Sequence, residues 1–463
     1  MDKYSWTTSE IISATSGKLL CGDINHRFSG ISIDSRKVVQ DDFFVAIKGA
    51  VHNGHNFIRD VIEKGISGVL LEENEVKLVE GYKDKICVAV SDTTIAIGNL
   101  ARFQRKRGNP VVVAITGSNG KTTCKEMTTS VSSKRFNTLF TTGNLNNEIG
   151  LPLTLFRLSK DHDVAVLELG MNNFGEIRRL SNICLPNIGV ITNIGPAHLE
   201  KLGSIDGVMN AKGELLENIQ SDGTAVLNAD DPRSLKLSAK ASTKVLLYGE
   251  SDFAQVRAKD IEEKEDITIF TLVLPQSEIK IKLNMPARFM VLNALSAAAV
   301  GYLLGLTGEE IKKGLEEFKP VTGRMNIFKN SKNINIIDDS YNANPGSMEA
   351  AILTLSKLKG SNRGILVIGD MLELGEAALE LHCKIGEIAS KLGINRLYVT
   401  GIFSSNVAES AIKSGMKYSD VFVGVHKDII EDISKWLNEG DWVLVKGSHA
   451  MQMEKIVFAL KEL

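Results

Sequence analysis

The sequence predicts an α/β protein with three domains, and three observations lead to that fold class. The chain has 463 residues, enough for about three domains of ~150 residues each. Short apolar runs of strand length alternate with helical patterns from residue 111 onwards, as in βαβ units with a parallel sheet. One such run, Val111–Ile115, leads directly into a glycine-rich turn that contains a lysine.

The composition is that of an ordinary globular protein and excludes several classes of function. Hydrophobic residues make up 43% of the chain, charged residues 24%, and the net charge is −2, which favours no nucleic-acid partner. The five cysteines lie far apart in sequence, so neither a zinc site nor a disulfide framework is expected. The chain opens without a basic segment and apolar core, and no run of about eighteen apolar residues follows. We therefore expect a cytoplasmic protein without stable membrane insertion.

Residues 1–108 are the first predicted domain, in which short helical and strand-like segments alternate. Its expected strands are Ile31–Arg36 and Asp42–Ile47. The basic cluster Arg102–Arg107 is expected to end a helix at the domain boundary, where cations complement the helix dipole. Arg107–Pro110 contains a glycine and a proline and is expected to be the linker.

Residues 109–319 are the predicted central domain, a parallel sheet with an added β-hairpin and a buried, alanine-rich helix at Asn293–Leu304. The further strands, with the two hairpin strands last, are expected at Val164–Leu169, Ile188–Thr192, Thr224–Leu227, Ile267–Leu274 and Ile279–Leu283.

Residues 320–463 are the third predicted domain, a Rossmann-like α/β unit in which strands and helices alternate again. Its strands are expected at Ile334–Ile337, Gly364–Ile368, Arg396–Val399, Val421–Val423 and Trp442–Val445.

The segment Thr116–Thr123 predicts a nucleoside-triphosphate site. It places a glycine-rich turn, Lys121 and two hydroxyls where a strand ends and a helix begins. That arrangement offers backbone N–H groups and an ammonium to a polyphosphate, and a hydroxyl to its Mg²⁺. The general phosphate-loop pattern has its first glycine at position 115, where this chain has Ile115, so the loop is a shorter variant. A chance glycine-rich turn is the weaker alternative.

Two polar residues follow other strands of the same predicted sheet. Glu168 lies at the carboxyl end of one strand, which is the edge where parallel sheets bind ligands, so we expect it to be a Mg²⁺ ligand. The alternative is an acidic residue that is merely solvated. His198 comes just past another strand, and a functional and a purely structural role are equally compatible with that position.

Three further segments carry candidate residues. Lys212 lies in a helical pattern, where an exposed helix lysine is the ordinary interpretation. Asn144, Asn146 and Asn147 form either a surface turn or a network that holds an oxygen-rich substrate. In the third domain, Asp338–Pro345 follows a strand, so its carboxylates could accept ribose hydroxyls and its amides could bind a second substrate. Lys446–His449 also follows a predicted strand and is a weaker candidate for binding a substrate.

Together these residues resemble the Mur ligases, ATP-dependent enzymes that form amide bonds in cytoplasmic peptidoglycan synthesis. The short loop Thr116–Thr123 is similar to that family's version. Glu168, Asn193, His198 and Lys212 stand where the family carries its metal and carbamate residues.

The resemblance implies ATP, two Mg²⁺ ions and CO₂ held as a carbamate on Lys212. Lys121, His198 and Lys212 are the expected catalytic residues; Thr122 and Glu168 would hold one metal ion, and His198 with the carbamate the other. The expected ATP-binding residues are Gly117, Ser118, Asn119, Gly120, Lys121, Thr122 and Thr123 in the loop, with Asn293 for adenine, Arg324 for phosphate and Asp339 for ribose.

Within the family, three segments are similar to the ligase that adds D-alanyl-D-alanine to UDP-N-acetylmuramoyl-tripeptide: Asp338–Pro345, Gly369–Gly375 and Lys446–Ser448. The first domain is similar to the family's uridine-nucleotide domain. The expected substrate-binding residues are Ser32, Asp34, Ser35, Arg36, Lys48, Asn144, Asn146 and Asn147, with Asn342 and Asn344 for the incoming dipeptide. Two departures from the family are Ala287–Met290, where relatives have a glycine followed by His-Asn, and His449, where arginine is commoner.

The resemblance implies that the tripeptide carboxylate attacks the γ-phosphate of ATP, and that the dipeptide amine then displaces phosphate from the acyl phosphate. A monomer is expected.

The alternative functions are a Mur-type ligase that adds a single amino acid, a folylpolyglutamate synthase or cyanophycin synthetase, and a nucleotide-binding module without ligase chemistry. Asp34–Arg36 argues against the folate enzyme, which opens directly with its ATPase domain.

Overall fold

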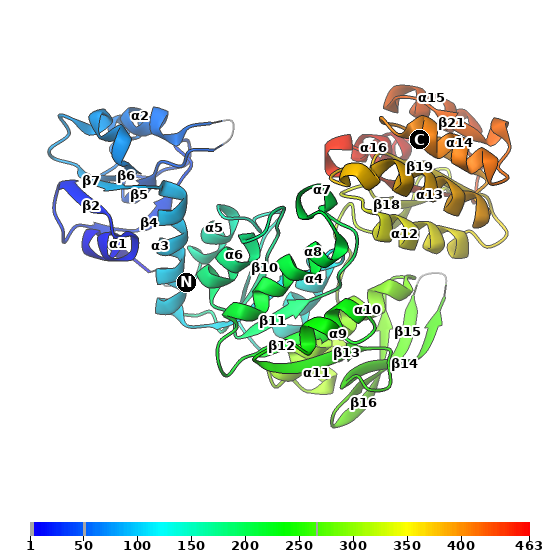
Figure 1. Ribbon diagram of the computed structural model, residues 1–463, viewed down its shortest axis with the longest axis horizontal. Coiled ribbons are helices and arrows are strands. Elements are labelled where there is room, and N and C mark those ends of the chain that lie inside the picture. Colours follow the sequence, from blue (N-terminus) through cyan, green and yellow to red (C-terminus); the bar gives the residue numbers. More distant parts are fainter. Residues whose placement is uncertain (1–3, 50–51, 265–266) are drawn as a thin grey trace.

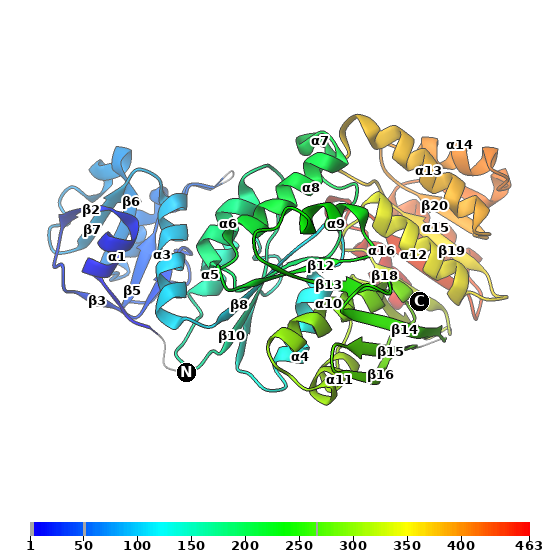
Figure 2. The same ribbon diagram turned by 60° about the horizontal axis from the view of Figure 1, so that its bottom comes forward.

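The computed structural model describes residues 4–49, 52–264 and 267–463 and shows three lobes, each with its own sheet (Figure 1). The N-terminal and C-terminal lobes lie at opposite ends of the molecule, and the central lobe lies between them (Figure 2). Residues 1–3, part of the N-terminal segment interpreted above, lie outside the described residues. No helix of the described part is long and apolar enough to cross a membrane.

The N-terminal lobe has a five-stranded sheet, mostly parallel, of which β4 (Gly30–Ser32) forms one edge. The prediction of a strand over Ile31–Arg36 is wrong beyond Ser32. Asp34 there accepts the backbone N–H and the guanidinium of Arg36 and so closes a turn that competes with strand pairing. The other elements are β1 (Trp6–Thr7), α1 (Thr8–Thr15), β2 (Lys18–Cys21), β3 (Arg27–Phe28), β5 (Asp42–Val45), η1 (Gly54–Phe57), α2 (Ile58–Glu63), β6 (Gly68–Glu72), η2 (Glu73–Val79), β7 (Ile86–Val90) and α3 (Thr93–Gly108).

Helix α3 joins the first lobe to the second, and it ends at Gly108 as the basic cluster predicts. Asn109 follows in the left-handed conformation with φ 45°, which stops the helix. Arg105 of α3 is buried and donates to the carbonyl oxygens of Cys184 and Leu185 in the central lobe. The end of this helix is therefore anchored on both lobes.

The central lobe has a nine-stranded sheet in the order β16-β15-β14-β13-β12-β11-β8-β10-β9. The expected parallel strands and the hairpin β15–β16 are confirmed. The sequence prediction missed β14 (Val256–Glu263), which pairs parallel to β13 and antiparallel to β15 and so makes the hairpin a continuation of the main sheet. The strand bounds are β8 (Val111–Thr116), β9 (Thr138–Phe140), β10 (Val164–Glu168), β11 (Ile188–Ile191), β12 (Thr224–Asn228), β13 (Lys244–Gly249), β15 (Thr268–Leu274) and β16 (Ser277–Leu283).

Helices cover both faces of the central sheet. Along β8, Val113 and Ile115 belong to one hydrophobic core and Val112 and Ala114 to another, because alternate residues of a strand face opposite sides. The helices are α4 (Lys121–Ser132), α5 (Gly150–Leu155), α6 (Glu176–Cys184), α7 (Leu199–Leu202), α8 (Ile205–Gly213), η3 (Glu214–Asn218), α9 (Pro232–Ser238), α10 (Arg288–Leu303) and α11 (Gly308–Glu316).

The C-terminal lobe has a six-stranded sheet in the order β17-β18-β22-β19-β20-β21, parallel except for β17 at one edge. All the strands expected here are confirmed. The elements are β17 (Asn326–Lys329), β18 (Asn335–Asp339), α12 (Pro345–Leu358), β19 (Gly364–Ile368), η4 (Gly375–Ala377), α13 (Ala378–Lys391), β20 (Arg396–Val399), α14 (Ser404–Lys413), η5 (Tyr418–Asp420), β21 (Val421–Val423), α15 (His426–Trp436), β22 (Trp442–Lys446), η6 (His449–Met451) and α16 (Glu454–Lys461).

Candidate functional site

A cavity of about 520 Å³ lies between the central and C-terminal lobes. The carboxyl ends of β8, β10 and β11 reach it from one side, and those of β18 and β22 from the other. In open α/β sheets this edge is where ligands bind. Sixteen of the predicted site residues line it: Ser118, Asn119, Gly120, Lys121, Thr122, Thr123, Asn144, Asn146, Asn147, Glu168, His198, Asn293, Arg324, Asp339, Asn342 and Asn344.

The phosphate loop between β8 and α4 packs closely against the segment after β11 and against helix α10. Gly117 has φ 152°, and a Cβ built on it would stand 1.9 Å from the hydroxyl oxygen of Thr192. Gly120 has φ 78°, and a Cβ there would stand 2.3 Å from the Asn293 amide oxygen. Both positions therefore require glycine. Ile115, where the general pattern has a glycine, is instead a fully buried residue of β8.

Lys121 begins helix α4 and points its ammonium back over the loop. Its Nζ donates to the carbonyl oxygen of Gly117 at 2.8 Å. Burial lowers the pKa of Lys121, and the nearby Glu168 carboxylate opposes that shift. The cation is thus held in a poorly solvated site at a helix N-terminus, where a phosphate would gain most from it.

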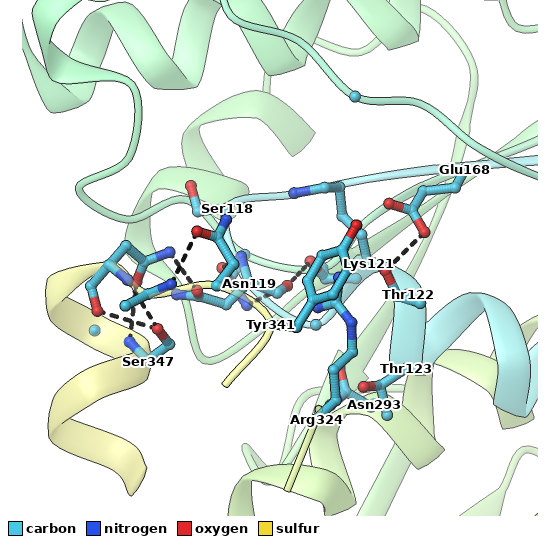
Figure 3. Close-up of a pocket in the computed structure, with 18 of the residues that line it drawn as sticks. Ser118, Asn119, Lys121, Thr122, Thr123, Glu168, Asn293, Arg324, Tyr341 and Ser347 are labelled. Atoms are coloured by element: carbon cyan, nitrogen blue, oxygen red, sulfur yellow. Dashed lines mark hydrogen bonds between the residues drawn. The ribbon is translucent and has the colours of Figure 1, made fainter. Parts of the chain in front are cut away.

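Thr122 and Glu168 meet behind the loop (Figure 3). The Thr122 hydroxyl donates to Glu168 Oε2 at 2.9 Å, and the Asn146 amide donates to Oε1 at 2.9 Å. Glu168 is buried, with 2% of its surface exposed. One hydroxyl and one oriented carboxylate beside a phosphate loop are the protein ligands that Mg²⁺ takes when phosphates and water complete its shell, so this pair fits the metal.

His198 and Lys212 are placed differently from each other. His198 lines the cavity, and its Nδ1 lies 2.6 Å from a carboxylate oxygen of Glu373 in the C-terminal lobe. Lys212 lies on α8 outside the lining of the cavity and is only 1% exposed, so its interpretation as an exposed lysine is wrong. Burial, and then the charge of Lys121, lower the pKa of Lys212 well below its usual value.

The three asparagines after β9 have separate roles in the structure. Asn146 orients Glu168, as described above. The side-chain oxygen of Asn147 accepts the backbone N–H groups of Ile149 and Gly150 at the start of α5, at 3.2 and 2.8 Å. This is a capping interaction, so the oxygen of Asn147 is already engaged by the protein. Asn144 lines the cavity.

The C-terminal lobe contributes a stack of three side chains, in which the sequence analysis gave no role to the central residue, Tyr341. The Arg324 guanidinium lies 4.3 Å from the ring centroid of Tyr341, and the His449 ring stacks on Tyr341 at 5.1 Å. Figure 3 shows Tyr341 and Arg324 next to each other, with Glu168 to one side of them. His449, a departure from the family pattern, and Arg324, the residue expected to bind phosphate, therefore both contact the ring of Tyr341.

Asp339 is engaged by the protein itself. Its Oδ2 accepts from Lys446 Nζ at 2.6 Å and its Oδ1 from the backbone N–H of Met325 at 3.1 Å. A carboxylate that is largely removed from water needs such partners, and the Asp339 side chain is only 13% exposed. The lobes also touch at Asn344, whose amide donates to the Asn119 side chain at 2.6 Å.

An apolar wall closes the cavity beside Asn293. It consists of Tyr248, Phe289, Met290 and Leu292, two of which belong to the departure Ala287–Met290. An apolar surface with one amide is suited to a nucleobase, which agrees with the adenine role expected for Asn293. The sequence analysis missed the wall because its residues come from β13 and α10, far apart in the chain.

The residues expected to bind uridine lie in the N-terminal lobe, outside the lining of this cavity. Ser32 ends β4, and Asp34, Ser35 and Arg36 lie in the turn that follows it. Arg36 pairs with Asp34 at 2.8 Å, and its hydrogen bond lowers the pKa of Asp34 to about 2. The Arg36 side chain is 84% exposed. Lys48 is exposed near Asn53, to which its backbone forms a bridge.

Comparison with known proteins gives the family. The models described as Mur ligase family, catalytic domain, as Mur ligase middle domain and as Mur ligase, glutamate ligase domain match residues 27–105, 115–301 and 323–449. The UDP-N-acetylmuramoyl-tripeptide–D-alanyl-D-alanine ligase of Escherichia coli (strain K12) is 37% identical to the chain over 465 residues, which cover 99% of each protein.

Two solved structures are also similar over nearly the whole chain. MurF from Acinetobacter baumannii is 31% identical, with a TM-score of 0.92 and 100% of both chains covered. MurF ligase from Thermotoga maritima, in complex with ADP, is 29% identical, with a TM-score of 0.82 and coverage of 94% of this chain and 97% of that one. The chain belongs to the Mur ligase family.

Proposed function

We propose that the chain is the ATP-dependent ligase that joins D-alanyl-D-alanine to UDP-N-acetylmuramoyl-tripeptide. The products are UDP-N-acetylmuramoyl-pentapeptide, ADP and phosphate. The relative from Escherichia coli carries this name and is similar over the full length. The observation that carries the proposal is the shared cavity: Lys121 of the phosphate loop and Arg324 of the C-terminal lobe both line it.

The chemistry requires a carboxylate to approach a triphosphate although both are anions. Lys121 and the backbone N–H groups at the start of α4 offset this repulsion at the γ-phosphate, and Arg324 adds a cation from the other lobe. The tripeptide carboxylate attacks phosphorus and ADP leaves; the dipeptide amine then attacks the acyl carbon and phosphate leaves. Contact between the lobes excludes water, which would hydrolyse the acyl phosphate.

Two Mg²⁺ ions complete the proposal. Thr122 and Glu168 would hold one; His198 and a carbamate on Lys212 would hold the other. When bound, the ions neutralise phosphate charge and align the transfer. The carbamate is supported by the burial and lowered pKa of Lys212, because CO₂ adds only to a neutral amine.

Each lobe has its own part in this proposal. The N-terminal domain, residues 1–108, holds the uridine diphosphate through the Asp34–Arg36 turn and Lys48. The central domain, residues 109–319, holds ATP, with Asn144 near the muramyl peptide. The C-terminal domain, residues 320–463, binds the dipeptide through Asn342 and Asn344. The protein acts as a monomer in the cytoplasm.

A matrix of substrates tests the function. Phosphate release is measured with ATP and Mg²⁺ for several UDP-muramyl peptides, each combined with D-alanyl-D-alanine, other dipeptides or single amino acids. Release that requires both the tripeptide nucleotide and D-alanyl-D-alanine supports the proposal. Release with a single amino acid would assign another Mur-type ligase, and nucleotide binding without release would exclude ligase chemistry.

The carbamate has a separate test. Lys212→Ala should nearly abolish phosphate release, and short carboxylic acids added to the variant should restore part of it by supplying the missing oxygen ligand. A fully active Lys212→Ala enzyme would remove the carbamate from the mechanism while leaving the substrate assignment intact.

A further inference from the structure

The central and C-terminal lobes meet at a second point beside the cavity, the 198–373 junction, which consists of His198 and Glu200 on one side and Glu373 and Gly375 on the other. Helix α7 lies next to the C-terminal lobe in both ribbon views (Figures 1 and 2). The Glu200 N–H donates to the Glu373 carbonyl oxygen at 3.2 Å. A Cβ on Gly375 would stand 3.1 Å from the Glu200 Cα, so glycine permits this close approach.

The two side chains of the junction face each other from strained backbone positions. His198 has φ 55° and Glu373 has φ 63°, the left-handed region that residues other than glycine rarely adopt. Their contact joins His198 Nδ1 to Glu373 Oε2 at 2.6 Å. Strain that the surrounding structure enforces is commonly found at functional sites.

The loop that carries Glu373 is fixed within the C-terminal lobe. The Met371 N–H donates to His382 Nε2 and the Leu372 N–H to the Ser448 hydroxyl, both at 2.9 Å. Asp370 accepts two further backbone N–H groups from the loop after β20. Leu374 is buried. The Glu373 carboxylate is therefore presented by a rigid support, although the side chain itself is half exposed.

The contact also fixes which nitrogen of His198 is free. A carboxylate can only accept, so Nδ1 must carry the proton that it donates to Glu373. Among the described residues no hydrogen bond reaches Nε2. A histidine whose Nδ1–H is held by a carboxylate offers the Nε2 lone pair, in a fixed orientation, to a metal ion.

We propose that Glu373 is a positioning residue for His198: it reaches across the lobe boundary, fixes the tautomer and orientation of the imidazole, and so completes a divalent-cation ligand only when the lobes are together. This inference rests on the proposed function, in which His198 binds the second metal ion. It couples the approach of the C-terminal lobe, which brings the dipeptide, to the metal site that serves ATP.

Mn²⁺ binding in the presence of ADP tests the proposal without any peptide substrate. Electron paramagnetic resonance of free Mn²⁺ gives the binding isotherm for the wild-type protein and for His198→Ala, which identifies the site that depends on the histidine. Loss of a carboxylate behind a metal-binding histidine commonly weakens metal affinity by about 10- to 100-fold. We expect Glu373→Ala to weaken the His198-dependent site by about tenfold or more.

Two variants provide controls. Glu373→Gln keeps an oxygen that accepts the Nδ1–H, so it should lose less affinity than Glu373→Ala. Glu376→Ala removes an exposed carboxylate from the same segment and should bind Mn²⁺ like the wild type. Thermal unfolding of each variant shows whether it is folded, and Glu373→Gln keeps the proposal testable if Glu373→Ala is not.

A double-mutant cycle separates positioning from a simple structural role. If Glu373 acts through His198, adding Glu373→Ala to His198→Ala should cause no further loss of Mn²⁺ affinity. Wild-type affinity in Glu373→Ala, or an equal loss with and without His198, would overturn the proposal. The expected Mn²⁺ affinities in all the variants, together with a wild-type protein that does not ligate D-alanyl-D-alanine, would instead overturn the proposed function alone.

Discussion

Replacing Lys446 by methionine should destabilise the C-terminal lobe strongly, because it leaves the largely buried carboxylate of Asp339 without its ion-pair partner. Lys446 is 2% exposed and Asp339 13%, and their side chains lie 2.6 Å apart. Lys446 Nζ also donates to the carbonyl oxygen of Asn342 at 2.9 Å. Breaking a buried pair by removing one partner costs about 3–5 kcal/mol. Asp339 keeps the Met325 N–H and some exposure, so we expect the lower end, about 3 kcal/mol.

Urea unfolding followed by tryptophan fluorescence measures this loss of stability in the C-terminal lobe. Two of the three tryptophans, Trp436 and Trp442, lie in the C-terminal lobe, so a Trp6→Phe background makes fluorescence report that lobe. At a slope of about 2 kcal/mol per molar urea, a loss of about 3 kcal/mol lowers the midpoint by about 1.5 M. Lys427→Met, which removes an exposed lysine of α15, should change stability by less than about 0.5 kcal/mol.

The double variant Lys446→Met/Asp339→Asn decides whether the charge is responsible. Asparagine still accepts the Met325 N–H but carries no charge, so the double variant should recover most of the loss. The reasoning is refuted if Lys446→Met alone shifts the midpoint by less than the Lys427→Met control, or if the double variant is as unstable as the single one.

Three further predictions concern the cap, the thiols and the uridine site. Asn147→Ala should lower the free energy of unfolding in urea by about 1 kcal/mol, because α5 loses its cap, and should leave KM for the nucleotide peptide unchanged. A raised KM would instead assign Asn147 to the substrate site. Burial raises the pKa of Cys87 and Cys184 to about 12 and that of Cys124 to about 11, so these thiols gain reactivity only as pH rises towards those values. An aromatic disulfide reagent near neutral pH should therefore modify only the partly exposed Cys21 and Cys383 in the native protein; faster reaction at a third thiol would contradict this. Arg36→Ala should raise KM for the nucleotide peptide by about tenfold or more with little change in kcat, since a charged hydrogen bond contributes about 1.5–3 kcal/mol. An unchanged KM would show that Arg36 does not belong to the uridine site.

Local patterns in the sequence were sufficient to predict most of the fold. Strands such as Gly364–Ile368 are continuous apolar runs, which buried parallel strands require on both faces. The loop Thr116–Thr123 combines strand, glycines and lysine within a few residues, and the structure confirms its placement between β8 and α4. Strand β14 was missed because its second half, Asp260–Glu263, is mostly exposed and interrupted by an irregularity in register. A half-exposed strand of this kind lacks a clear alternation.

The arrangement of the site could be predicted only in part, since it depends on contacts between distant segments. That Glu168 ends a strand beside the phosphate-loop strand followed from the strand pattern, and the structure confirms it; the hydrogen bond from Thr122 to Glu168 is a contact that only the structure shows. That Lys212 is buried and that Glu373 meets His198 could not be read from either local pattern. Asn147 shows the converse: its residue type suits both a substrate network and a helix cap, and only the geometry of α5 distinguishes them.

The central claim is that the cavity between the lobes lets the tripeptide carboxylate attack the γ-phosphate of ATP. Oxygen-18 in that carboxylate tests this directly, because the amine displaces phosphate from the acyl carbon of the acyl phosphate, and the released phosphate keeps the bridging oxygen that came from the carboxylate. The mechanism predicts one labelled oxygen in each phosphate when D-alanyl-D-alanine is ligated. Ligation that releases unlabelled phosphate would contradict it.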